Sequence, residues 1–195
     1  GQVPDGHAVV AGEEHQRGAG EQAAAVEDGT APGGAREFEP RGAVVSDVRS
    51  ISGMINEYAS AKIMLARGPQ YIYENIKDYT VVTVPVPNKQ GMQDIVVACG
   101  AVHVLWEDLA EIRSIAVHPK FHRKGLGSKI VNALIEESRA LGIRRLFTFT
   151  LAVEFFQSFG FIEYPRNDIP PIVWVECSKC SKYYNCDETG MILHI

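Results

Sequence analysis

Hydrophobic positions recur at helical spacing in two long stretches of this chain. After Ser46 and Asp47, which suit the N-cap of a helix, one helical face carries the apolar residues Val48, Ile51, Met54, Ile55 and Tyr58. The range 125–141 shows the clearest pattern, with an apolar stripe made of Leu126, Ile130, Val131, Leu134, Ile135 and Leu141. The pattern therefore predicts two amphipathic helices, and Pro69 begins a short third one between them.

A strand pattern occupies most of the remaining apolar segments. β-Branched and aromatic residues fill the ranges 79–86 and 95–104, and turn residues at 87–91 join them into a hairpin. Further elements are a short helix over 152–159, strands over 111–117, 145–151 and 161–164, and an edge strand near 191–195. The order β-α-α-β-β-β-α-β-α-β is a mixed α/β pattern and not the regular alternation of a doubly wound fold.

Composition divides the chain into two parts. Residues 1–40 carry eight acidic and two basic residues, a net charge of −6, so the remaining residues contribute +1 to the total of −5. The range 1–37 is rich in Gly, Ala and Glu without periodicity, which predicts a disordered acidic tail before one domain over 38–195. A near-neutral domain gives no reason to expect nucleic acid as a partner.

Targeting signals are also lacking in the pattern. No apolar run reaches the roughly 18 residues of a membrane span, and the first residues do not resemble a signal peptide. We therefore expect a cytoplasmic protein that acts on a small molecule without contacting a membrane.

The segment with the most chemical information lies between the strand at 111–117 and the helix at 125–141. The loop after Pro119 is basic and rich in glycine, and reads His122, Arg123, Lys124, Gly125, Leu126, Gly127 and Ser128. Unpaired N–H groups at a helix start form an anion site, and the basic side chains suit a pyrophosphate. The alternative interpretation is a tight strand-to-helix turn that needs small residues.

The order of elements and this loop resemble the GNAT acetyltransferases, whose motif reads (Gln/Arg)-x-x-Gly-x-(Gly/Ala). The resemblance implies the GNAT fold, an α/β (α+β) architecture with splayed parallel strands in a mixed sheet flanked by helices. It also implies acetyl-CoA as co-substrate, bound by Ile115, Ala116 and Val117 and by residues 122–128. His122 stands at the Gln/Arg position, and Phe156, assigned to cofactor binding, stands where many members have a tyrosine that protonates the leaving thiolate.

A closer resemblance is to the short, stand-alone N-acetylglutamate synthases of bacteria. It rests on the ranges 99–104, 109–117, 154–156, 177–180 and 185–188. It implies acetyl transfer to the α-amine of L-glutamate, the first step of arginine biosynthesis, with Arg67 facing the substrate carboxylates. The apolar run Pro171-Ile172-Val173-Trp174 departs from these synthases, which usually carry a basic residue there. Members of the fold often pair through sheet edges, so a homodimer is one expectation.

Candidate roles follow from the chemistry of acetyl transfer to an amine. Glu111 is predicted to take the ammonium proton, with a strand-end salt bridge as its alternative interpretation. The Val117 amide is predicted to polarise the thioester oxygen. Arg67 and Arg113 are predicted to bind substrate carboxylates, although Arg113 also suits a surface ion pair. His103 and His118 are interpreted as structural.

The C-terminal cysteines allow two interpretations. Cys177, Cys180 and Cys186 have the spacing C-x2-C-x5-C, which suggests thiolate ligation of zinc. A structural zinc needs four ligands, and no fourth ligand has a diagnostic spacing. We therefore expect reduced, partly buried cysteines and no metal.

Two other functions remain open at this point. An acetyltransferase for another small amine or a protein N-terminus would share the loop without needing Arg67 and Arg113. A non-catalytic acyl-CoA-binding module would keep the loop without needing an acid or a base.

Overall fold

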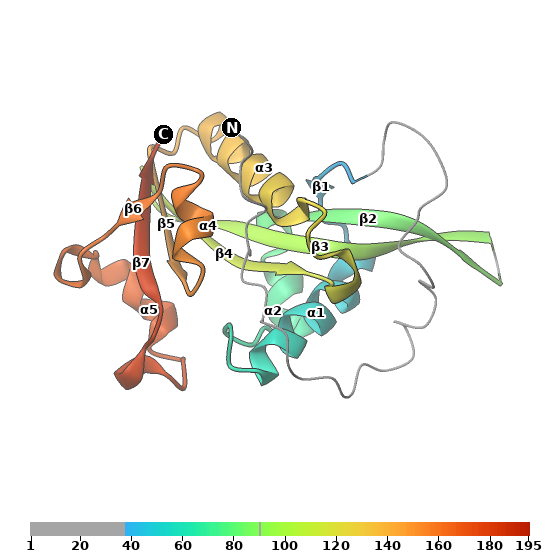
Figure 1. Cartoon of the computed structure of the whole chain (residues 1–195), viewed down its shortest axis with the longest axis horizontal. Coiled ribbons are helices and arrows are strands. Elements are labelled where there is room, and N and C mark those ends of the chain that lie inside the picture. Colours follow the sequence, from blue (N-terminus) through green and yellow to red (C-terminus); the bar gives the residue numbers. More distant parts are fainter. Residues whose placement is uncertain (1–37, 90) are drawn as a thin grey trace.

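The computed structural model describes residues 38–89 and 91–195, which form one mixed sheet with helices on both faces (Figure 1). The strand order is β1-β2-β3-β4-β5-β7-β6. The strands are β1 (Arg41–Gly42), β2 (Tyr79–Asn88), β3 (Gly91–Trp106), β4 (Leu109–Val117), β5 (Arg145–Thr150), β6 (Ile162–Glu163) and β7 (Thr189–His194). The predicted disordered tail at 1–37 lies outside the described residues.

The helices divide between the two faces of the sheet. They are α1 (Val48–Ser60), α2 (Pro69–Glu74), α3 (Leu126–Ala140), α4 (Val153–Gln157) and α5 (Trp174–Cys177). Short 3-10 turns lie at Val45–Asp47, Ile76–Asp78, Pro119–Phe121, Arg166–Asp168, Pro171–Val173 and Tyr183–Asn185. In Figure 1, α3 lies above the sheet, and α1 and α2 lie below it.

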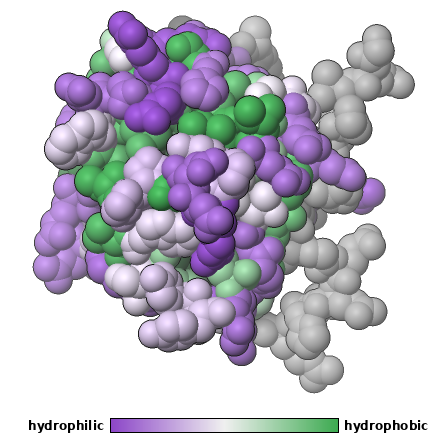
Figure 2. Space-filling model, turned by 90° about the vertical axis from the view of Figure 1, so that its left-hand side faces the viewer, coloured by the Kyte–Doolittle hydropathy of each residue, from purple (hydrophilic) through white to green (hydrophobic). Residues whose placement is uncertain are grey.

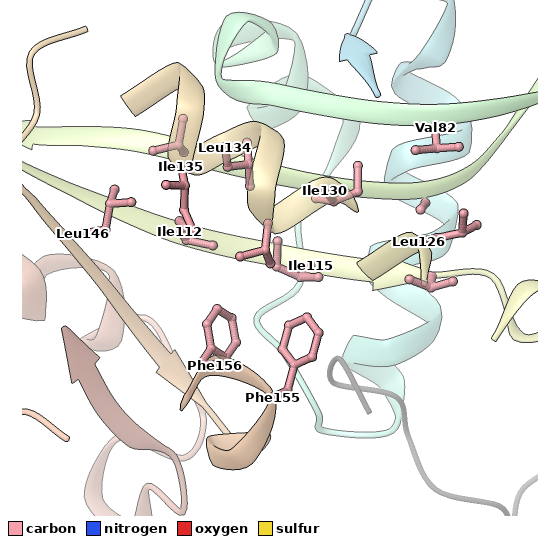
Figure 3. Packing of buried hydrophobic residues seen from close by; sticks show 14 of the residues in the cluster. Val82, Ile112, Ile115, Leu126, Ile130, Leu134, Ile135, Leu146, Phe155 and Phe156 are labelled. Atoms are coloured by element: carbon pink, nitrogen blue, oxygen red, sulfur yellow. The ribbon is translucent and has the colours of Figure 1, made fainter. Parts of the chain in front are cut away.

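Alternation along the strands builds a core on each face. Val82 on β2 and Ile112 on β4 pack with Leu126, Ile130 and Leu134 of α3, and Phe155 and Phe156 of α4 face the same core (Figure 3). Val81 and Ala116 face the other way and pack with α1 and α2, where the apolar face of α1 is Val48, Ile51, Met54, Ile55 and Tyr58. Successive strand residues point to opposite faces, so one sheet supports both layers.

The centre of the sheet opens where β4 leaves β5. The two strands are parallel and pair only from Leu109↔Arg145 to Glu111↔Phe147. Beyond Glu111, β4 pairs only with β3, while β5 continues along β7 up to Thr150↔Thr189. The predicted fold class, a mixed sheet with splayed parallel strands, is therefore confirmed.

A β-bulge lies directly beside this opening. Cys99 pairs with Ala116 and Ala101 pairs with Arg113, so that Ser114 and Ile115 on β4 lie opposite the single residue Gly100. Ser114 has φ +57°, a left-handed conformation that is uncommon for a residue with a side chain.

Several sequence-based boundaries were wrong. β7 is not an edge strand, because it lies between β5 and β6, and β6 forms the edge. Strand pairing in the β2–β3 hairpin continues to Asn88↔Gly91, so the turn is tighter than the predicted 87–91. Leu141, assigned to the buried stripe of α3, is 59% exposed because the helix ends at Ala140.

The predicted N-cap of α1 uses its side chain differently. Asp47 occupies the N-cap position, but its carboxylate accepts the Val44 N–H (2.9 Å) and pairs with Arg41 (2.7 Å). The carboxylate therefore ties β1 to the helix start instead of capping the first turn of α1.

The end of the molecule that carries β6, β7 and α5 has a mixed surface. Figure 2 shows apolar residues there in separate groups among polar ones, and the exposed apolar side chains include Ile162 and Val175. The sheet ends in two-residue strands on both sides, and β1 pairs with only Thr80 and Val81 of β2, while β6 pairs with only Met191 and Ile192 of β7. The homodimer stays a prediction. No helix within the described ranges has the length and apolar content needed to span a membrane.

Candidate active site

A cleft of about 340 Å³ lies against the opening between β4 and β5, on the sheet face that carries α1 and α2. Its walls come from the α1–α2 loop (residues 59–67), from β4 (residues 111–114) and from the segment 166–188. This volume is in the range of small-molecule sites. The cleft therefore brings together Arg67, Glu111 and Arg113, which the sequence places far apart.

Arg67 is fixed by its own backbone. Its N–H donates to Asn56 Oδ1 (3.0 Å), and its carbonyl accepts from Asn56 Nδ2 (2.8 Å) and Ser52 Oγ (3.0 Å), so α1 holds the loop on both sides. The guanidinium carbon lies 4.2 Å from the centroid of the Tyr71 ring, a cation–π contact. The Arg67 side chain is buried, and it is held before any ligand arrives.

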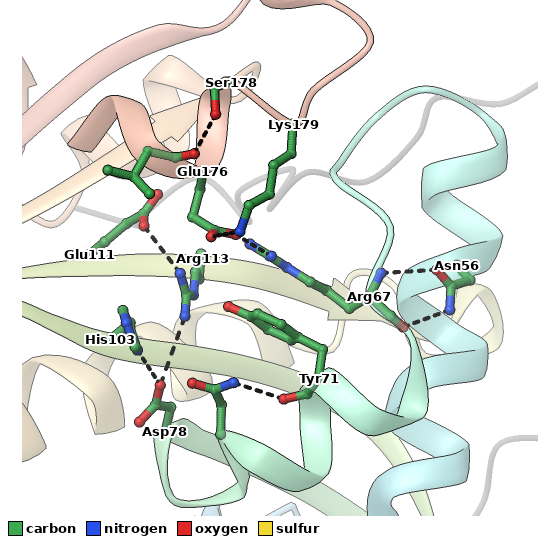
Figure 4. Close-up of polar contacts among 12 residues, drawn as sticks. Asn56, Arg67, Tyr71, Asp78, His103, Glu111, Arg113, Glu176, Ser178 and Lys179 are labelled. Atoms are coloured by element: carbon green, nitrogen blue, oxygen red, sulfur yellow. Dashed lines mark hydrogen bonds and ion pairs between the residues drawn. The ribbon is translucent and has the colours of Figure 1, made fainter. Parts of the chain in front are cut away.

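The guanidinium of Arg67 already has an acidic partner. Its Nη1 donates to Glu176 Oε2 at 2.5 Å, and Glu176 Oε1 accepts from Lys179 Nζ at 2.7 Å (Figure 4). Burial opposes the charge on Glu176, but the hydrogen bonds from Lys179 and Arg67 outweigh it and lower the pKa of Glu176 to about 2. Glu176 is therefore an anion in the cleft across the working pH range.

Arg113 lies between two carboxylates of its own. Its Nη1 is 3.5 Å from Glu111 Oε2 and its Nη2 is 3.9 Å from Asp78 Oδ2, which also lies 2.5 Å from His103 Nδ1 (Figure 4). The guanidinium carbon lies 5.6 Å from the Tyr71 ring centroid, so Tyr71 faces both arginines. Arg113 therefore forms ion pairs, as its alternative interpretation expected, but at a buried position instead of at the surface.

Glu111 sits at the last residue pair that joins β4 to β5. Burial raises the pKa of this carboxyl group, and the positive charges of Arg113 and Arg67 partly oppose that rise. Among the described residues, Glu111 Oε2 and the Nε atoms of Arg67 and Arg113 have no hydrogen-bond partner. Both interpretations of Glu111, proton acceptor and ion-pair partner, are compatible with this position.

The predicted cofactor segment follows on the same strand. The side chain of Ile115 packs on the α3 side of the sheet, and that of Ala116 packs on the α1 side. The backbone of these residues therefore borders the opening between β4 and β5. The His118 N–H donates to the Val97 carbonyl of β3 (2.8 Å). Because successive strand amides point to opposite sides, the Val117 N–H points away from β3, toward the opening. The predicted role of this amide is consistent with that direction and stays a prediction.

The basic loop turns sharply before α3. Arg123 (φ +59°) and Gly125 (φ +71°) both adopt left-handed backbone conformations. The Lys129 N–H donates to the Gly125 carbonyl (3.0 Å), an i→i−4 helical hydrogen bond at the start of α3. The N–H groups of Leu126, Gly127 and Ser128 lie before this bond, in the first turn of the helix. The side chains of Arg123 and Lys124 are exposed on the same loop. This geometry is compatible with an anion site at a helix N-terminus and with the alternative of a tight strand-to-helix turn, so the anion site stays a prediction.

His122 turns inward where the sequence predicted cofactor contact. Its Nε2 lies 3.0 Å from the Val117 carbonyl oxygen and 3.1 Å from the Tyr58 hydroxyl, which itself donates to that carbonyl. The side chain thus ties the loop to the end of β4 and to α1. The Tyr58 contact was not predicted, because Tyr58 fits the apolar face of α1.

Phe156 is part of the core. Its ring is buried and meets the rings of Phe155 and Phe161 edge-to-face at centroid distances of 5.2 Å each. In this structure the ring anchors α4. Because the ring is buried, its predicted contact with the cofactor stays a prediction.

The two histidines and the three C-terminal cysteines differ in their surroundings. His103 pairs with Asp78, and His118 Nδ1 accepts the Lys120 N–H (3.3 Å), so both have structural partners. Cys177, Cys180 and Cys186 line the cleft as free, half-buried thiols. Within the part of the chain that the structure describes, no group of three or more His, Cys, Asp or Glu side chains is placed to hold a metal ion.

Sequence reasoning missed the segment that closes the cleft. Glu176 and Lys179 come from it, and Arg166 stacks 4.7 Å from the ring centroid of Trp174, whose ring meets Phe149 of β5 at 5.4 Å. These residues follow no helical or strand period. The resemblance to the synthases included ranges 177–180 and 185–188, but it gave Glu176 and Lys179 no role.

Comparisons with known proteins identify the family of this chain. A family model described as the acetyltransferase (GNAT) family matches residues 57–161. The chain belongs to the GNAT acetyltransferase family. A GNAT relative, the amino-acid acetyltransferase of Mycobacterium tuberculosis, is 36% identical over 73% of this chain and 78% of its own.

Solved GNAT structures show the same architecture. A Mycobacterium tuberculosis protein in complex with CoA and NLQ superposes with a TM-score of 0.64 at 32% identity, covering 80% of this chain and 98% of that one. The N-acetylglutamate synthase of Neisseria gonorrhoeae, complexed with coenzyme A and N-acetyl-glutamate, gives a TM-score of 0.67 at 20% identity. That match covers 80% of this chain and 34% of the longer one, and at this identity it shows the fold alone.

Proposed function

We propose that this GNAT enzyme transfers the acetyl group of acetyl-CoA to the α-amine of L-glutamate, the first step of arginine biosynthesis. The observation that carries the proposal is the pair of buried arginines in the cleft, Arg67 and Arg113, each with an Nε that has no partner among the described residues. A buried guanidinium needs acceptors, and a carboxylate matches its donors in geometry and charge.

The charge of the cleft supports an acidic acceptor. Its lining contains six basic residues (Lys62, Arg67, Arg113, Arg166, Lys179 and Lys182) against three glutamates (Glu111, Glu176 and Glu188), a net charge of +3. A cleft lined by an excess of one charge concentrates ligands of the opposite sign. A relative named amino-acid acetyltransferase supports an amino acid as the acceptor.

The two substrates would meet at the opening between β4 and β5. Acetyl-CoA would lie along β4 from Ile115 to Val117, with its pyrophosphate on the amides that begin α3. The acceptor would enter from the cleft on the opposite sheet face, with its carboxylates at Arg67 and Arg113. Binding both in one geometry removes much of the entropic barrier to their reaction.

The chemical step would be direct attack of the amine on the thioester carbonyl. Glu111 would accept the ammonium proton, and the Val117 N–H would donate to the developing oxyanion. The new amide bond forms as the carbon–sulfur bond breaks and CoA leaves as a thiolate. The phenyl ring of Phe156 has no proton to give, so the thiolate takes its proton from solvent or another group.

Release of free thiol from acetyl-CoA, with each amino acid offered in turn, tests the proposal. We expect release that depends on L-glutamate. Arg67→Ala and Arg113→Ala should each raise KM for L-glutamate about tenfold or more, since a hydrogen bond to a charged group contributes about 1.5–3 kcal/mol. Their KM for acetyl-CoA should stay within about twofold, because both side chains lie on the acceptor side.

Two other arginines provide the controls. Arg139→Ala removes an exposed arginine paired with Glu136 on α3 and should change neither KM. Arg123→Ala should weaken acetyl-CoA and spare L-glutamate. Thiol release with a different amine would identify that amine as the acceptor in place of L-glutamate. Tight CoA binding without thiol release for any amine would contradict the proposal that the protein is an enzyme.

A further inference from the structure

The Arg67 guanidinium, in the ligand-free cleft, is bound by a carboxylate of the protein itself. Glu176 reaches it from α5, on the opposite wall of the cleft, through one oxygen only. The other oxygen of Glu176 binds Lys179. The contact that a substrate carboxylate would make with Arg67 is therefore already made within the chain.

The two partners differ in how firmly the fold holds them. Arg67 has its backbone bonded on both sides to α1 and its guanidinium against Tyr71. Glu176 belongs to the four-residue helix α5, and its side chain is 20% exposed, against 7% for that of Arg67. If the pair separates, Glu176 is the side that moves.

We propose that Glu176 is a specificity-determining residue of the acceptor cleft. Its carboxylate binds the Arg67 guanidinium at the position where a carboxylate of the acceptor binds. The inference rests on the proposed function and adds to it a carboxylate exchange. An incoming carboxylate replaces Glu176, so the buried Arg67 keeps an anionic partner throughout. Glu176 then retains Lys179 through its second oxygen, which lowers the cost of its displacement.

This exchange selects the chemistry of the ligand. A ligand without a carboxylate would leave Arg67 without a counter-ion if it displaced Glu176, so the closed pair rejects it. A ligand with a carboxylate binds, but more weakly than to a free Arg67. Its apparent affinity is reduced by the fraction of protein in which Arg67 is available.

The test is Glu176→Gln, measured by glutamate-dependent thiol release. The amide is a weaker partner for Arg67, so KM for L-glutamate should fall by about fivefold or more while kcat and KM for acetyl-CoA stay within about twofold. The double variant Glu176→Gln with Arg67→Ala should lose this gain, because the effect acts through Arg67. Glu136→Gln is the matched control, since Glu136 forms an ion pair of the same length with Arg139 outside the cleft.

Lys179→Met gives a second, opposite expectation. Without Lys179 the displaced Glu176 has no partner and competes more strongly for Arg67, so KM for L-glutamate should rise. Lys179 also contributes positive charge to the cleft, and Lys182→Met measures that effect by removing a charge from the same lining at a residue paired with Asp187 instead of Glu176. A larger rise in Lys179→Met than in Lys182→Met therefore decides the question if Glu176→Gln fails to fold. An unchanged or raised KM in Glu176→Gln, or an unchanged or lowered KM in Lys179→Met, would show that Glu176 orients Arg67 instead of competing for it.

The proposed function can fail separately from the exchange. Absence of glutamate-dependent thiol release by the wild type refutes the function. The exchange is then judged by calorimetric Kd values for L-glutamate on the CoA-loaded protein. Tighter binding by Glu176→Gln than by wild type supports the exchange, and equal, weaker or undetectable binding overturns it.

Discussion

Glu111 combines the features that a base in an acetyltransferase site requires. It lies on β4 at the point where β5 diverges, it borders the cleft, and burial raises the pKa of its carboxyl group despite two nearby arginines. A carboxylate with a raised pKa is a stronger proton acceptor than an exposed one. The same residue also balances the charge of Arg113, so its removal affects binding as well as chemistry.

The raised pKa of Glu111 predicts a pH dependence. The base acts only when deprotonated, so kcat should fall on the acid side through a pKa above 4.5, the ordinary value for glutamate. Glu111→Gln should lower kcat about 10²- to 10⁴-fold and abolish that limb of the profile. Glu107→Gln, an exposed glutamate in the β3–β4 turn, is the control. An acid limb that persists unchanged in Glu111→Gln would assign the titration to another group.

Residue types could be predicted from the sequence better than their partners. The resemblance to synthases helped to select Arg67, and the chemistry of acetyl transfer to an amino acid selected Arg113 and Glu111. All three border one cleft. Glu176 was missed because its contact with Arg67 joins residues 109 positions apart, and nothing in the local pattern records it. The partners of a buried charge depend on tertiary packing, which a single sequence does not display.

At the scale of elements, helix and strand patterns were predictive for the central sheet and its two long helices. Apolar periodicity predicted α1 and α3, and β-branched and aromatic runs predicted β2 and β3. The segment 165–188 has no such period, and its α5 and 3-10 turns were not foreseen. β7 was expected at an edge because sequence order says little about which strand neighbours which.

The bulge on β4 depends on one glycine of β3. A Cβ atom at Gly100 would lie 2.4 Å from Ile115 Cδ1 and 2.5 Å from Ile130 Cγ2, closer than side chains approach. Both isoleucines are buried between the sheet and α3, so neither has free space to move into. The close approach of α3 to the bulge therefore requires glycine at this position.

Gly100→Ala should destabilise the fold and disturb the cofactor strand. Overpacking in a closed core costs about 1–3 kcal/mol, and the strand displaced by it includes the Val117 amide. We expect a lower midpoint in urea unfolding together with a raised KM for acetyl-CoA. Gly53→Ala, on α1 with no atom within 4 Å of its added Cβ, is the matched control and should not destabilise. Wild-type stability of Gly100→Ala would refute the packing argument.

For the whole molecule, the sheet separates the two predicted substrate sites and joins them at its opening. The glycine-rich loop begins α3 on one face, and the acceptor cleft lies on the face of α1 and α2. Both predicted sites border the divergence of β4 and β5, where two substrates on opposite faces of the sheet could meet. This arrangement favours direct transfer in a ternary complex over two separate half-reactions.

The alternative would need a nucleophile that carries the acetyl group between the two sites, and the cleft cysteines are the candidates. Burial raises the pKa of Cys177 to about 12, which leaves it protonated and weakly nucleophilic at neutral pH. Double-reciprocal plots against both substrates should therefore intersect, and the triple variant Cys177→Ala, Cys180→Ala and Cys186→Ala should keep kcat within about threefold. Parallel lines, with an acetylated cysteine recovered after incubation with acetyl-CoA alone, would establish the two-step route and contradict direct transfer across the opening of the sheet.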